Sequence, residues 1–140
     1  MRSSIHRASK ADIYELIRFY GEDKFDETQV AFFRKCVTNA AQLYVGFVDD
    51  EVVCFWGLIP PSLLSDSAYL WLYTAEELKG NEFVFVRQSQ IAVREMLLHY
   101  TEVIGHTEAG NTKGIRWLRW LGAEFGHPLG QVIPFTIRRK

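Results

Sequence analysis

Residues 111–125 (NTKGIRWLRWLGAEF) bring together side chains that could do chemistry or bind a partner. The segment sets two tryptophans and two arginines inside one helix-like run, with the near-repeat Ile-Arg-Trp-Leu and Arg-Trp-Leu-Gly. Tryptophan and arginine dominate protein contact surfaces, but apolar residues at helical spacing also build cores. The pattern therefore predicts a binding surface, a catalytic helix, or a helix whose aromatic face is core.

Metal, disulfide and serine chemistries lack the spacing that they require. The four histidines are scattered, which argues against a metal site. Cys36 and Cys54 lack CxxC spacing and lie in helical or apolar patterns, so we expect reduced, buried thiols. Ser62, Ser65 and Ser67 have no Gly-x-Ser-x-Gly context, so nucleophilic serine chemistry has no support.

The composition predicts one folded domain over residues 1–140. Hydrophobic residues make up 48% and aromatic residues 14% of the chain, which argues against disorder. The formal net charge of −1 gives no global attraction to nucleic acid or membranes. The N-terminus lacks an apolar signal region and no apolar run approaches membrane-spanning length. We therefore expect a soluble protein that is not secreted by a signal peptide.

Basic side chains gather in two places. Lys113, Arg116 and Arg119 lie in the helix-like segment, and residues 138–140 are all basic. A solvated helix face and a solubilising tail are the expected roles, with a phosphate site as the alternative.

The N-terminal part predicts a strand followed by two helices. Residues 3–7 have the pattern of a short strand. Ser9 is expected to cap a helix with apolar residues at helical spacing, which ends at Gly21. Residues 27–39 predict a second helix.

The middle of the chain predicts an antiparallel meander. The apolar period changes to two at residue 42, and strands at residues 42–48 and 52–59 flank a tight turn at residues 49–50. Residues 68–73 (AYLWLY) form the third strand. Trp56 and Trp71 alternate within these strands and are expected in the core.

The C-terminal part predicts helix, strand, helix and a final hairpin. Asn81 can cap a long helix over residues 82–99, a strand follows at 100–107, and residues 111–121 form the last helix. Two closing strands flank residues 126–130. The whole order predicts an α/β (α+β) domain with one mixed, mostly antiparallel central sheet and helices on both faces.

This order resembles the GNAT (Gcn5-related N-acetyltransferase) fold, and residues 111–125 carry the most specific part of the resemblance. Many members of that superfamily show Asn, then Ala three residues on, Tyr at seven, Gly at eleven and Phe at twelve. The matching positions here are Asn111, Gly114, Leu118, Gly122 and Ala123, with Phe125 just beyond. The Asn and Gly framework is kept, and the resemblance implies a GNAT-like single domain.

Two departures from the family pattern argue against its chemistry. The resemblance implies a tyrosine at Leu118 that protonates the departing CoA thiolate, and leucine has no proton to give. Typical members also carry a glycine-rich turn for the CoA pyrophosphate after the third meander strand. Here the segment has one glycine, Gly80, after Glu76 and Glu77, which would repel phosphate.

The same segment is also similar to the C-terminal signature of internal virion protein A of short-tailed bacteriophages and its phage-encoded relatives. The shared run is Asn-x-x-x-Ile-Arg-aromatic-Leu-x-x-(Leu/Ile)-Gly-Ala-x-Phe. Those proteins are of similar length and carry a tryptophan-bearing strand before the long helix, as Trp71 does here. The resemblance implies a GNAT-fold protein that has lost the usual acetyl-CoA features. It also implies location in the virion or host cytoplasm, with phage or host proteins as partners.

The candidate cofactor and catalytic residues each have a structural alternative. The resemblance implies that Asn111 contacts the pantetheine arm, and Asn111 also fits a helix N-cap. Glu76 and Glu77 lie near the place where the superfamily often keeps a general base, and they also fit a solvated turn. His106 ends a strand beside the presumed cleft, where a lone histidine is usually structural.

The candidate contact residues lie on the last helix. Ile115, Leu118 and Leu121 predict a buried stripe, with Trp117 and Trp120 flanking it. Arg116 and Arg119 are expected to point away from Leu118 toward water or acidic partners. These two tryptophans and two arginines form the predicted protein-contact surface.

The sequence supports three functional hypotheses. The first is a non-catalytic phage protein that acts through protein contacts in virion assembly or infection and needs no cofactor. The second is an N-acyltransferase that moves an acyl group from acetyl-CoA to an amine, with Glu76 or Glu77 as base and Asn111 at the pantetheine. The third is a module that keeps an acyl-CoA or nucleotide pocket without turnover. Homo-oligomerisation is left open.

Overall fold

A computed structural model of the protein describes residues 2–21, 25–62, 64–74 and 85–139. Within these residues, seven strands form one sheet in the order β1-β2-β3-β4-β5-β7-β6, in which only the β4–β5 pair is parallel. The strands are β1 (Ser3–Arg7), β2 (Gln42–Val48), β3 (Glu51–Ile59), β4 (Ser67–Thr74), β5 (Glu102–Glu108), β6 (Glu124–Phe125) and β7 (Val132–Arg138).

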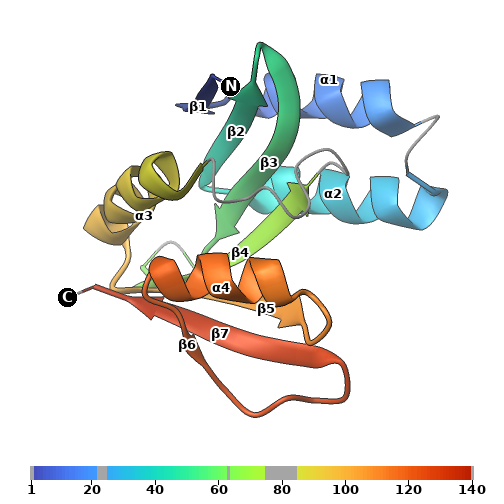
Figure 1. The fold of residues 1–140 in the computed structure, drawn as a ribbon. Coiled ribbons are helices and arrows are strands. Elements are labelled where there is room, and N and C mark those ends of the chain that lie inside the picture. Colours follow the sequence, from blue (N-terminus) through green and yellow to red (C-terminus); the bar gives the residue numbers. More distant parts are fainter. Residues whose placement is uncertain (1, 22–24, 63, 75–84, 140) are drawn as a thin grey trace.

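The helices cover the two faces of the sheet in pairs (Figure 1). They are α1 (Lys10–Gly21), α2 (Glu27–Asn39), α3 (Val86–His99) and α4 (Thr112–Trp120). The core under α1 and α2 contains Ile13, Phe33 and Trp71, while the core on the opposite face joins Met96 of α3 and Leu118 of α4. This is the predicted mixed, mostly antiparallel sheet with helices on both faces.

Local signals explain why the elements begin and turn where they do. The Ser9 hydroxyl accepts a hydrogen bond from the Asp12 N–H (3.1 Å), and the Asp12 carboxylate accepts one from the Ser9 N–H (3.2 Å), so the predicted cap of α1 is confirmed. Asp49 and Asp50 both have positive φ, 49° and 68°, which gives the predicted two-residue turn between β2 and β3.

The predicted start of the strand at residue 100 needs correction, and the predicted start of the long helix lies outside the described residues. The strand predicted from residue 100 begins at Glu102, because the Tyr100 N–H still bonds to the Met96 carbonyl and closes α3. Helix α3 begins at Val86, with Phe85 at the N-cap position. The predicted cap Asn81 and the predicted helix start at residue 82 lie outside the described residues.

The buried aromatic and thiol groups are where the sequence predicts them. Trp56 and Trp71 are both buried. Gly57 faces Trp71 across β3 and β4, and a Cβ at Gly57 would collide with the Trp71 ring and the Leu43 side chain. Cys36 and Cys54 are free and buried, and burial raises their pKa from 9.0 to about 11 and about 12 respectively.

Alkaline pH is expected to destabilise the fold through these thiols. Their folded pKa values are raised, so their contribution to stability is full below pH 9 and is lost as the pH rises toward 11 and 12. The loss is about 1.4 kcal/mol per pH unit for each buried thiol. Urea denaturation at a series of pH values from 8 to 11 should show this decline, and Cys54→Ala should make it shallower. Equal slopes in the two proteins would contradict the assignment.

Candidate functional site

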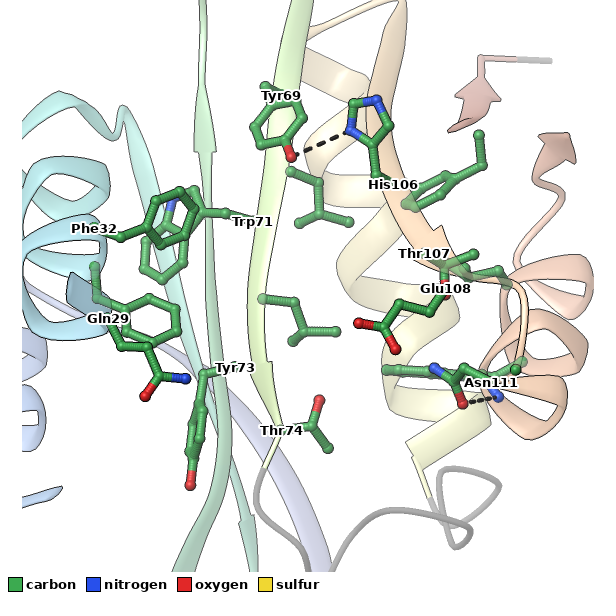
Figure 2. Close-up of a pocket in the computed structure, with 18 of the residues that line it drawn as sticks. Gln29, Phe32, Tyr69, Trp71, Tyr73, Thr74, His106, Thr107, Glu108 and Asn111 are labelled. Atoms are coloured by element: carbon green, nitrogen blue, oxygen red, sulfur yellow. Dashed lines mark hydrogen bonds between the residues drawn. The ribbon is translucent and has the colours of Figure 1, made fainter. Parts of the chain in front are cut away.

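Strands β4 and β5 are neighbours in the sheet, yet they separate along most of their length. They pair only from Ser67 to Tyr69 on β4 and from Glu102 to Ile104 on β5, although β4 continues to Thr74 and β5 to Glu108. A cavity of about 990 Å³ lies where they part, with side chains of both strands around it (Figure 2). The middle of the sheet is therefore an open site.

Four parts of the fold line this cavity. They are Phe25 with α2 (Gln29, Phe32, Phe33), β4 (residues 69–74), β5 with the turn after it (residues 106–108, 110 and 111), and α4 with β7 (Gly114, Trp117, Leu118, Phe135). Apolar and aromatic side chains predominate, with a few polar groups among them, which is the usual composition of a small-molecule site.

A tyrosine–histidine pair joins the two strands where they begin to part. Tyr69 Oη lies 3.3 Å from His106 Nδ1, and Figure 2 shows the two side chains facing each other across the gap. Burial, followed by the charge of the Cys36 thiolate, raises the pKa of Tyr69, so the phenol remains protonated at neutral pH. The histidine tautomer decides which atom donates in this bond.

Asn111 caps α4 and lines the cavity at the same time. Its side-chain oxygen accepts a hydrogen bond from the Gly114 N–H at 3.1 Å, which confirms the N-cap. A Cβ at Gly114 would collide with the Asn111 side chain, so glycine at this position lets the cap close. The cap leaves open whether Asn111 also contacts a ligand.

Helix α4 presents leucine where the family resemblance implies a tyrosine. Leu118 is buried and lines the cavity, so this position supplies no proton donor. Trp117 also lines the cavity, and its Nε1 is buried with no hydrogen-bond partner in the described part of the chain. Leu121 packs against the same core, in keeping with the predicted buried stripe.

The four predicted contact residues do not share one exposed surface. Trp117 turns into the core, whereas Trp120 is 52% exposed and Arg116 is exposed. The Arg119 guanidinium lies 5.6 Å from the centre of the Phe125 ring, where it covers that ring. Contact of Trp120 and the arginines with another protein stays a prediction.

Three further predictions concern the candidate bases Glu76 and Glu77, a metal site and a membrane-spanning segment. Glu76 and Glu77 lie outside the described residues. Across the described residues, no group of three His, Cys, Asp or Glu side chains could hold a metal ion. A search of the same residues finds no helix long and apolar enough to cross a membrane.

Sequence reasoning missed Tyr69 and the contribution of α2. The alternation of β4 contains a signal for Tyr69, because Tyr69, Trp71 and Tyr73 must share one side of the strand. Nothing in the sequence indicates that His106 lies opposite Tyr69 or that Gln29 and Phe32 reach the same cavity, since these contacts depend on chain segments far apart in sequence.

The comparisons with known proteins identify the fold. No protein-family model and no curated protein sequence matches the chain. Among solved structures, it is similar to an IAA acetyltransferase from Bacillus cereus, with a TM-score of 0.69 and 11% identity over 99% of this chain and 100% of that one. It is also similar to a dodecameric spermidine N-acetyltransferase from Vibrio cholerae, with a TM-score of 0.67 and 14% identity over 97% and 93%.

A ribosomal-protein-alanine N-acetyltransferase from Brucella melitensis gives a TM-score of 0.63 and 18% identity over 96% of this chain and 99% of that one. At such identities the likeness establishes the fold alone. The protein has the GNAT acetyltransferase fold that its element order predicts. The resemblance to phage internal virion proteins gains no support from these comparisons.

The Asn111 cap is expected to contribute measurably to stability. Asn111→Ala removes the acceptor for the Gly114 N–H and should lower the free energy of unfolding by about 1 kcal/mol, whereas Asn111→Ser should retain most of it. Urea denaturation of the three proteins measures the difference. Equal stability of the alanine and serine variants would show that the cap contributes nothing.

Proposed function

We propose that the protein is an acyl-CoA-dependent N-acyltransferase whose acyl thioester is held between β4 and β5. The observation that carries the proposal is the parting of these strands after Tyr69 and Ile104, which leaves a cavity inside the sheet. The GNAT fold, shared with the acetyltransferases named above, supports the same choice. Of the three hypotheses that the sequence supports, we thus prefer the N-acyltransferase to the non-catalytic phage protein.

The residues around the cavity fit the pantetheine arm of acyl-CoA. This arm is an extended chain with amide groups, and the facing edges of separated strands offer N–H and C=O groups in a sheet-like pattern. Within the described residues, the β4 edge beyond Tyr69 and the β5 edge beyond Ile104 lack a partner strand between them. Asn111, at the start of α4, lines the same cavity, and in this proposal its side chain contacts the arm.

Tyr69 and His106 are the groups that can move a proton in this cavity. When bound, acyl-CoA would supply an acyl thioester, whose C–S bond breaks as a C–N bond forms to an acceptor amine. A neutral His106 can accept the proton that the amine loses, if its Nδ1–H donates to Tyr69 Oη and leaves Nε2 with a lone pair.

The same proton can leave His106 for the departing sulfur, which balances the reaction without an acid at Leu118. Tyr69 would act by fixing the histidine tautomer, because its hydroxyl accepts the Nδ1–H bond and does not ionise near neutral pH. The base role implied for Glu76 or Glu77 stays an alternative. The non-catalytic phage role rests on the sequence resemblance alone.

Acetyl-CoA is expected to bind in the cavity and stabilise the protein. Ligand at 100 times its Kd should add about 2.7 kcal/mol to the free energy of unfolding and raise Tm accordingly. Leu72→Trp places a bulky ring in the cavity and should abolish the shift, whereas Leu64→Trp, on an exposed residue outside the lining, should keep it. Absence of any shift at millimolar acetyl-CoA would favour the non-catalytic hypothesis.

Loss of His106 is expected to impair turnover without impairing binding. His106→Gln should lower kcat/KM for amine acylation by about 10²-fold while leaving the Kd for acetyl-CoA nearly unchanged. Thiol release measures the first quantity and calorimetry the second, and His99→Gln, on an exposed residue at the end of α3, is the matched control. Full activity of His106→Gln would exclude His106 as the base, and binding without thiol release by wild type would indicate a binding module.

A further inference from the structure

The side of the cavity that faces α2 is built mainly from aromatic rings, with the Gln29 side chain beside them. Phe25 meets Tyr73 edge-on with ring centres 5.0 Å apart, and Phe33 lies 6.0 Å from Trp71. Phe32 extends this cluster outward, with its ring centre 5.5 Å from that of Phe33, and is 52% exposed. An apolar ligand could therefore reach the cluster through Phe32 at its rim.

Tyr69 and His106 lie on this same side. Trp71 packs in the core under α1 and α2, so its alternate neighbours on β4, Tyr69 and Tyr73, also face α2. The hydrogen bond between Tyr69 and His106 brings the His106 ring to that side of β5. The proposed base and the aromatic wall therefore share one half of the cavity, opposite the half lined by Leu118 and Phe135.

The charge of the lining restricts the ligand further. The described lining residues include no Lys or Arg, and Glu108 is their only carboxylate. Figure 2 shows the Glu108 side chain directed into the space between the two strands. Within the described lining, Glu108 can attract one cationic amine, and no cationic side chain is present to pair with a carboxylate or phosphate on the acceptor. In this described lining a polycation would meet one carboxylate for several positive charges.

We infer that the acyl acceptor is a primary amine with an apolar body, preferably aromatic, that packs against Phe32 and Tyr73 with its nitrogen toward His106. The inference rests on the proposed N-acyltransfer and names its substrate class. Glu108 attracts the protonated amine, which releases one proton to water and so becomes the nucleophile. His106 then takes the second proton, which the nitrogen loses as the C–N bond forms, and passes it to the departing sulfur. Burial of an aromatic body against the wall contributes the specificity.

The test compares amines of similar reactivity and different bodies. Thiol release from acetyl-CoA is measured with 2-phenylethylamine, spermidine and γ-aminobutyrate as acceptors, alongside the thermal shift with acetyl-CoA alone. We expect kcat/KM for 2-phenylethylamine to exceed the other two values by about 10-fold or more, the ratio that burial of an aromatic ring supports. Faster turnover of spermidine or γ-aminobutyrate would overturn the substrate class and leave the N-acyltransferase function standing.

A pair of surface variants tests the wall itself. Phe32→Ala should raise KM for 2-phenylethylamine about 5-fold or more, with little change in kcat and none in the kinetics of propylamine, whose body is too short to need the ring. Phe19→Ala is the matched control, because Phe19 is 75% exposed on α1 and is not part of the lining. Equal losses for both amines in Phe32→Ala, with an unchanged melting temperature, would overturn the role of the wall. Absence of thiol release with every amine would overturn the proposed function and this inference together.

Discussion

The short pairing between β4 and β5 is the constraint on which the site depends. Three residue pairs hold the two strands together, and beyond them each strand is held only from its outer side. β3 pairs with β4 as far as Thr74, and β7 pairs with β5 as far as Glu108, so each strand stays paired on its outer side while the two part. The cavity thus lies between two well-supported strands.

A similar glycine–aromatic arrangement on each arm keeps this cavity open. Trp71 lies over Gly57 on β3, and Phe135 of β7 lies over Gly105 on β5. A Cβ at either glycine would collide with the ring opposite. Each large ring therefore rests on a neighbouring strand and lines the cavity without filling it. The absent side chains of two glycines thereby make room for a ligand.

The cavity differs from the pattern that the GNAT resemblance implies at two places, Leu118 and the junction of β4 and β5. Leu118 makes the α4 side of the cavity apolar, while Tyr69 and His106 place a hydrogen-bonded pair at the junction of β4 and β5. An apolar wall lies on one side of the space between the strands and an aromatic wall on the other, while Tyr69 and His106 remain exposed at the junction. Leucine at position 118 is thus compatible with the proposed transfer chemistry at the strand junction.

Local patterns in the amino-acid sequence are enough to predict the element order, the meander, the turn at Asp49 and Asp50, the caps at Ser9 and Asn111, and the apolar character of Leu118. These features follow from local periodicity and from side chains that bond within three or four residues, so a linear pattern contains them. It also suggested a contact surface that included Trp117, and the packing of α4 turns that ring into the core. Three features become visible only in the folded chain: β4 and β5 part after three pairs, Tyr69 contacts His106 across 37 positions of sequence, and α2 supplies an aromatic wall. These features depend on contacts between segments that are far apart in sequence. Packing on both faces of the sheet sets those contacts, and no periodic pattern in the sequence indicates them.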